Sequence, residues 1–99
     1  MSSRHSSGRN FDADASKSSF HRLLPRYKVV LHRAADKGLL FIAGVVRDLT
    51  RYGEAEAMTR MWEAYHRGRS LVLVTHLERA ELYVEQFRDR GLFASIEPA

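Results

Sequence analysis

The sequence contains no cysteine, so disulfide bonds, thiolate metal sites and thiol nucleophiles are excluded. The absence fits a reducing compartment, and we expect the protein in the cytoplasm. Long hydrophobic runs are also missing, because the longest, residues 39–46, contains Gly44 and is far shorter than the roughly 20 residues of a membrane span. Residues 1–17 lack the apolar core of a secretory signal. We therefore expect neither export nor a membrane partner.

The usual signs of catalysis and of cofactor binding are missing too. The sequence has no Ser-centred nucleophile elbow, Gly-rich phosphate loop or His-Glu helix signature. Its histidines show no paired ligand spacing on one element; they are His5, His21, His32, His66 and His76. We therefore expect a protein that is not an enzyme and that needs no metal or cofactor.

The 99 residues suit one small domain, and 44% hydrophobic and 28% charged residues are ordinary globular values. The net charge of +4 is unevenly distributed. Residues 1–26 carry five basic and two acidic side chains, whereas residues 27–99 carry eleven and ten. The basic excess is thus mostly near the start of the chain, which makes nucleic acid an unlikely partner for the folded part.

Residues 1–24 are rich in Ser and Arg and poor in large apolar side chains. Such a composition cannot offset the entropy that ordering would cost. We predict a disordered N-terminal arm over residues 1–24 and a folded domain over residues 25–99.

Hydrophobic patterns in the second region predict three strands and three helices. The strands are residues 27–31, the apolar run 71–74 and the alternating residues 92–96. The apolar run is typical of a strand that is buried on both faces or that is central in its sheet. The helices cover residues 39–52, about 54–67 and about 75–90. The order β-α-α-β-α-β predicts an α/β (α+β) fold, a two-layer sandwich with the helices on one face of the sheet.

Particular residues are predicted to begin or end the helices. Gly53 would end the first helix in the left-handed conformation, and Gly91 would stop the third. Thr75 and Glu78 have the spacing of a capping box at the start of the third helix.

Two helical surfaces have a structural and a functional interpretation. Met58, Met61, Trp62 and Tyr65 recur at helical spacing, which favours a core stripe, although exposed Met and aromatic side chains also line binding pockets. On the third helix Glu78, Glu81 and Glu85 share one side, which is either a solvated face or a docking face.

Three segments together resemble the ClpS family, small adaptors of the Clp protease: residues 27–31 (YKVVL), residues 61–69 (MWEAYHRGR) and residues 91–98 (GLFASIEP). The similarity covers about residues 25–99. It implies three antiparallel strands and three helices behind a flexible arm. It also implies a partner, the N-terminal domain of a hexameric AAA+ unfoldase, and protein substrates whose first residue, the N-degron, is Leu, Phe, Tyr or Trp.

The family's α-ammonium site holds the substrate amine with an Asn-Asp-Asp type run and a His, and this sequence departs from both. The matching positions are Arg33, Ala34, Ala35 and Tyr65; His66 is one residue further on, about 100° round the helix. Each lost charge-assisted hydrogen bond is worth roughly 1.5–3 kcal/mol, so we predict that N-degron recognition is weakened or lost. Asp36 and the Tyr65 hydroxyl are the remaining acceptors, and Arg33 would suit an acidic or phosphorylated segment.

Other positions of this sequence match the family pattern more closely. The apolar pocket for the first side chain matches residues that are all apolar here and that core packing would explain equally well: Leu39, Ile42, Met61, Ala64 and Leu92. On the unfoldase-docking face Glu78 matches an acidic position, and Tyr83 stands where a Lys is common.

The resemblance favours a ClpS-like adaptor that docks on a Clp-type unfoldase and modulates or delivers substrates for proteolysis. Two alternatives remain at this stage. One is a protein-interaction module of the same fold without a link to a protease. The other is nucleic-acid binding through the basic arm, which would give a steep salt dependence.

Overall fold

The computed structural model describes residues 24–99. The predicted arm, residues 1–24, therefore lies outside the described residues apart from Leu24. Three strands and three helices follow in the predicted order: β1 Arg26–His32, α2 Leu39–Thr50, α3 Glu54–Arg67, β2 Arg69–His76, α4 Leu77–Asp89 and β3 Ala94–Pro98. None of these helices is long and apolar enough to cross a membrane.

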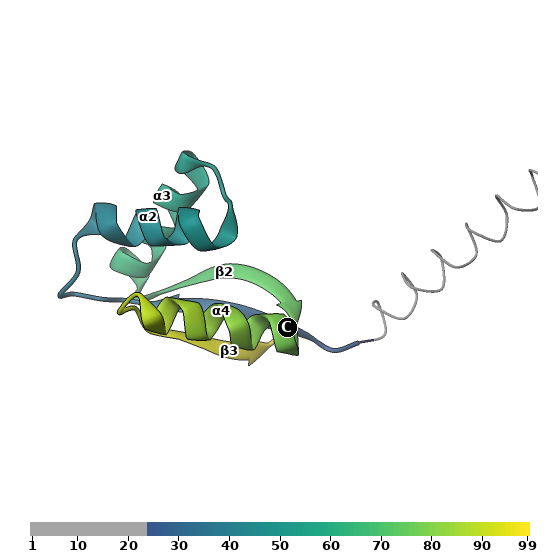
Figure 1. The fold of residues 1–99 in the computed structure, drawn as a ribbon. Helices are drawn as coiled ribbons and strands as arrows, with labels where there is room; N and C mark the ends of the chain where they lie inside the picture. Colours follow the sequence, from purple (N-terminus) through teal and green to yellow (C-terminus); the bar gives the residue numbers. More distant parts are fainter. Residues whose placement is uncertain (1–23) are drawn as a thin grey trace, which may run out of the picture.

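The three strands form an antiparallel sheet in the order β2-β1-β3, so the first strand is central. Val29 of β1 lies opposite Leu73 of β2 and Ile96 of β3. A bulge between Val29 and Val30 shifts the β1–β2 register. Figure 1 shows the helices against this sheet, with α2 and α3 side by side and α4 along the strands. The predicted fold is confirmed.

One hydrophobic cluster joins the helices to the inner face of the sheet, and β1 contributes Val29 and Leu31 to it. Phe87 of α4 is its largest fully buried side chain. Because helices α2, α3 and α4 all contribute to this cluster, they cover the same face of the sheet.

Strand β2 differs from its prediction because only one of its faces is covered. Ser70 and Val72 point into the core, whereas Leu71 and Val74 are exposed on the open face. A strand in a two-layer fold alternates between core and solvent, even where its sequence is apolar throughout. Strand β2 is also an edge strand of the sheet, so both predictions for it, burial on both faces and a central position, were wrong.

The end of α2 also differs from its prediction. The Thr50 hydroxyl donates to the Val46 carbonyl at 2.6 Å and accepts from the Tyr52 amide at 3.1 Å, which closes the helix before Gly53. Arg51, with φ 67°, takes the left-handed position expected for Gly53, which is extended and precedes α3.

The predicted capping box is also absent from the start of α4. Thr75 still belongs to β2, where it pairs with Tyr27, so His76 takes the N-cap position without a capping hydrogen bond from its side chain. At the other end Gly91, with φ 83°, follows the helix as predicted.

Candidate functional site

The end of β1 and the end of α3 meet at one end of the molecule (Figure 1). The Arg33 amide donates to the Gly68 carbonyl at 3.0 Å, which joins the segment after β1 to the turn after α3. Gly68 has φ 87°, a conformation that favours glycine. This junction fixes Arg33 next to the last turn of α3.

The Arg33 side chain closes the C-terminus of α3. Its Nε donates to the Tyr65 carbonyl at 3.0 Å, and its Nη2 donates to the His66 carbonyl at 3.4 Å. These carbonyls carry the negative end of the helix dipole, so a guanidinium there is favourable. The cation therefore neutralises a helix end that would otherwise attract positive charge.

The two alanines that follow provide no side-chain acceptor. Ala34 packs partly against the core and its carbonyl accepts from the Lys37 amide at 3.1 Å, while Ala35 is exposed. The remaining carboxylate of this loop, Asp36, pairs with Lys37 at 3.8 Å. The predicted amine-site residues thus lie at the same end of the molecule. They present a cation, methyl groups and one phenol: Arg33, Ala34, Ala35 and Tyr65.

Trp62, Tyr65 and His66 form an exposed aromatic face on α3. The Trp62 and His66 rings stack at 4.9 Å between centroids, and Tyr65 meets both edge-on. Trp62 is 42% exposed and Tyr65 47% exposed. The core assignment was therefore correct for Met61, which is buried, and wrong for Trp62.

The residues of the predicted apolar pocket come together in the core. Ile42, Met61, Ala64 and Leu92 are buried, and Leu39 is partly buried against them. Core packing explains their burial. A pocket among them for the first side chain of a substrate stays a prediction.

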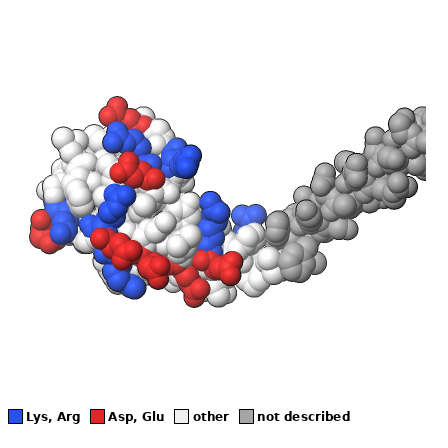
Figure 2. All heavy atoms as spheres, viewed as in Figure 1, with Lys and Arg blue, Asp and Glu red and all other residues white. Residues whose placement is uncertain are grey.

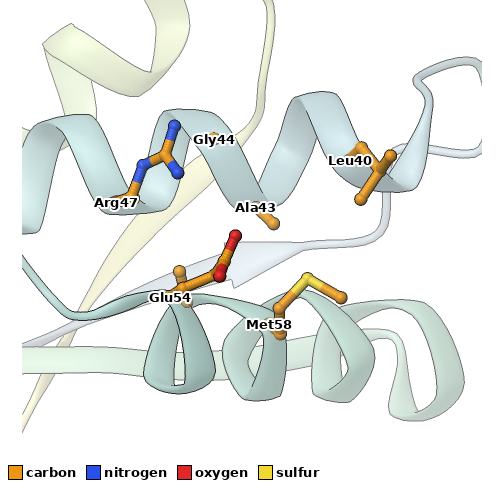
Figure 3. Close-up of a pocket in the computed structure, with 7 residues that line it drawn as sticks. Leu40, Ala43, Gly44, Arg47, Glu54 and Met58 are labelled. Carbon is orange, nitrogen blue, oxygen red and sulfur yellow. The ribbon is translucent and has the colours of Figure 1, made fainter.

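A cavity of about 220 Å³ lies between α2 and α3, and the sequence did not indicate it. Leu40 and Met58 line one end, and Arg47 and Glu54 lie toward the other (Figure 3). The small residues Ala43, Gly44 and Ala57 leave this space between the helices. Only the pairing of two helices creates it, so a periodicity in either one could not reveal it.

Helix α4 carries the acidic row that the sequence predicted. Glu78, Glu81 and Glu85 line a hollow around Leu82, which is itself 51% exposed. Figure 2 shows acidic side chains along the edge of the molecule that α4 forms in Figure 1. Tyr83 packs partly against the core, and the Arg79 guanidinium lies 5.9 Å from its ring.

Glu63 of α3 is held by internal partners. Its carboxylate accepts from the buried Ser70 hydroxyl at 2.8 Å and from Arg60 at 3.4 Å. The Ser70 hydrogen bond is the main cause that lowers the pKa of Glu63, helped by Arg60 and by the charge of Arg67 and opposed by desolvation. The carboxylate of Glu63 therefore has its partners within the junction between α3 and β2.

Comparison with known proteins finds no matching family model. The "ATP-dependent Clp protease adapter protein ClpS" of Synechococcus sp. (strain CC9902) is 39% identical over 75 residues, which cover 75% of this chain and 72% of that protein. The chain belongs to the ClpS family. The ClpS of Synechococcus elongatus (strain ATCC 33912 / PCC 7942 / FACHB-805) is 33% identical over 78% of this chain and 82% of its own length.

A solved ClpS structure agrees with the fold. ClpS2 of Agrobacterium tumefaciens, bound to L-phenylalaninamide, superposes with a TM-score of 0.73 at 25% sequence identity. The match covers 76% of this chain and 98% of that one. Both the resemblance to ClpS and the three-stranded antiparallel architecture are thus confirmed.

Proposed function

We propose that this ClpS-family chain is a cytoplasmic adaptor that docks on the N-terminal domain of a Clp-type AAA+ unfoldase and delivers protein substrates or modulates their delivery. Its recognition of N-degrons is weakened or lost. Family membership supports the adaptor function, because the relatives are named as adapters of the ATP-dependent Clp protease. The altered substrate recognition follows from the chemistry of the Arg33 junction.

One observation carries the altered recognition: the Arg33 guanidinium is bound to the Tyr65 and His66 carbonyls. An incoming α-ammonium group would meet this cation and the methyl groups of Ala34 and Ala35. Loss of two charge-assisted hydrogen bonds lowers affinity by about a hundredfold or more, before the repulsion from Arg33 is added. By contrast, the ClpS2 relative is described in complex with L-phenylalaninamide, a compound with a free amine.

The docking surface that we propose is the acidic row of α4. Glu78 is exposed there, beside the exposed Leu82. Tyr83 replaces the Lys common in the family, so the contact with an unfoldase uses an aromatic side chain at that position. An exposed carboxylate next to an apolar anchor suits a basic, partly apolar patch on a partner.

Calorimetry with a peptide that begins with Phe tests the altered recognition. We expect weak or undetectable binding to the natural chain. The combined substitution Arg33→Asn, Ala34→Asp, Ala35→Asp and Tyr65→His restores acceptors and should create binding that an acetylated copy of the peptide lacks. A micromolar or tighter constant for the natural chain would contradict the proposal.

Docking is tested separately by pulling down a purified Clp-type unfoldase with the full chain. Glu78→Lys should abolish retention, whereas Asp89→Lys, at the far end of α4, should leave it unchanged. If the natural chain retains no unfoldase, the adaptor function is wrong and an interaction module without a protease link is the better description.

A further inference from the structure

The aromatic face of α3 has the composition of a binding surface. Trp62, Tyr65 and His66 expose their rings to solvent although they contact one another. Trp, Tyr and Arg are the residue types that dominate the energy of protein interfaces, and the Arg33 guanidinium lies against the Tyr65 and His66 carbonyls. Three neighbouring exposed rings form a larger apolar patch than coverage of the core requires.

The charge around this face is positive. Arg33 lies against the last turn of α3, is exposed, and forms no ion pair within residues 24–99. Arg67, the last residue of α3, is about 200° round the helix from Tyr65, and its charge acts on Glu63. Arg33 is therefore the cation that this face offers to a negatively charged partner.

Helix geometry connects this face to the cavity between α2 and α3. Met58 lines the cavity, and Trp62 follows it by four residues, which places both on one side of the helix. Leu40, on the opposite wall, is highly exposed. An apolar side chain of a partner could thus enter the cavity while its neighbours lie on the rings.

We propose that the aromatic face binds an extended protein segment in which acidic residues alternate with large apolar ones, independently of a free N-terminus. The apolar residues pack on Trp62 and Tyr65, and a carboxylate pairs with Arg33. Its interpretation as substrate binding rests on the proposed function; the binding itself does not.

A peptide suits this surface better than nucleic acid does. The described residues carry nearly as many acidic as basic side chains, and the face offers Arg33 rather than a continuous track of cations. A nucleic-acid surface contacts several phosphates in succession. The acidic row of α4 would repel a polyanion that extended across the molecule.

The chain has a single Trp, so its fluorescence reports on this face directly. The probe is a short acetylated peptide in which Asp and Glu alternate with Leu and Phe, titrated into the full chain. We expect saturable binding with a change in Trp62 emission, and binding that weakens as salt is added. A matched peptide with Lys in place of Asp and Glu should not bind.

Two variants locate the contact, with a dye on the peptide for anisotropy. Tyr65→Ala and Arg33→Glu should each weaken binding by about tenfold or more. Leu71→Ala, an exposed Leu on the open face of β2, should leave it unchanged. Circular dichroism and thermal unfolding of each variant separate lost contact from lost fold.

Three results would overturn the proposal: equal binding of the acidic and the Lys peptides, tighter binding of a single-stranded oligonucleotide than of the acidic peptide, or concentration-dependent burial of Trp62 by a second copy of the chain. Because the peptide is acetylated and no unfoldase is present, these results are independent of the amine site and of docking. A negative result with the acidic peptide would therefore not contradict the adaptor function. A negative result in the unfoldase pull-down would not contradict the peptide contact.

Discussion

Met61 and Trp62 are neighbours on α3, yet they have opposite environments. Met61 is 1% exposed and belongs to the core, whereas Trp62 is 42% exposed and stacks on His66. One step along a helix is a rotation of about 100°, which is enough to leave the core. The apolar stripe of α3 is thus wider than the surface that the core covers, and the surplus forms the aromatic face.

Met61→Ala should have the largest effect on the buried side of this comparison. Removal of a fully buried Met leaves a cavity, so we expect the free energy of unfolding to fall by about 2–5 kcal/mol. Urea denaturation followed by circular dichroism measures it. Met61→Leu, which nearly conserves volume, should cost less than about 1.5 kcal/mol. A loss below about 1 kcal/mol for the Ala variant would mean that Met61 does not pack tightly.

Ser70→Ala tests the charged side of the junction between α3 and β2. It removes the hydrogen bond to the Glu63 carboxylate, at an expected cost of about 1–2 kcal/mol near pH 7. Since that bond lowers the pKa of Glu63, its contribution is present above the unfolded pKa of about 4.3 and is lost as the pH falls through the lower folded value.

Urea unfolding of both proteins from pH 7 to pH 3 measures this dependence. The difference between the natural chain and Ser70→Ala should shrink on acidification. A difference that stays constant with pH would show that the hydroxyl does not act through the ionised carboxylate.

Arg33→Gln should have a smaller effect on stability, because the guanidinium is exposed to solvent. We expect a loss of about 1 kcal/mol, from two hydrogen bonds and a favourable position at the helix end. Thermal unfolding at low and high salt checks it, since screening should reduce the loss. Arg67→Gln provides the comparison: no hydrogen bond from its side chain is present within residues 24–99, so its effect should be weaker.

Trp62→Ala should have the smallest effect on folding. The side chain is exposed and stacks on His66, and we expect a loss of about 1 kcal/mol or less. The same variant should abolish binding of the acidic peptide in the anisotropy assay. Together with Met61→Ala it forms the sharpest contrast, because one residue is needed for folding and the next for binding. A loss from Trp62→Ala as large as that from Met61→Ala would remove the distinction.

The sequence was sufficient for the order of elements and for their packing on one face of the sheet. The alternation along residues 92–96 predicted a strand, and the helical spacing from Met58 to Tyr65 predicted a helix. Both are local signals, and the structure agrees with them. Boundaries were harder to predict. The Thr50 hydroxyl ends α2 through bonds to Val46 and Tyr52, and Thr75 is held in β2 by its pairing with Tyr27, neither of which a capping pattern encodes.

The candidate site could be predicted in part. The unusual residues at Arg33, Ala34, Ala35 and Tyr65 were visible from the resemblance to ClpS, but not the contact between the Arg33 guanidinium and the last turn of α3. That contact joins residues 32 positions apart and depends on how the chain returns after β1. The exposure of Trp62 was missed for a similar reason, because a helical stripe gives the direction of the core and not its extent.

The central position of strand β1 fixes the distance between its two ends. Pro25 and Arg26 lie at one end of it and Arg33 at the other, and seven residues of strand span about 23 Å. Both edges of β1 are hydrogen-bonded to neighbouring strands, so this length cannot change without breaking the sheet. The strand is a rigid spacer, and whatever attaches before Arg26 is kept at a set distance from a segment held beside Arg33.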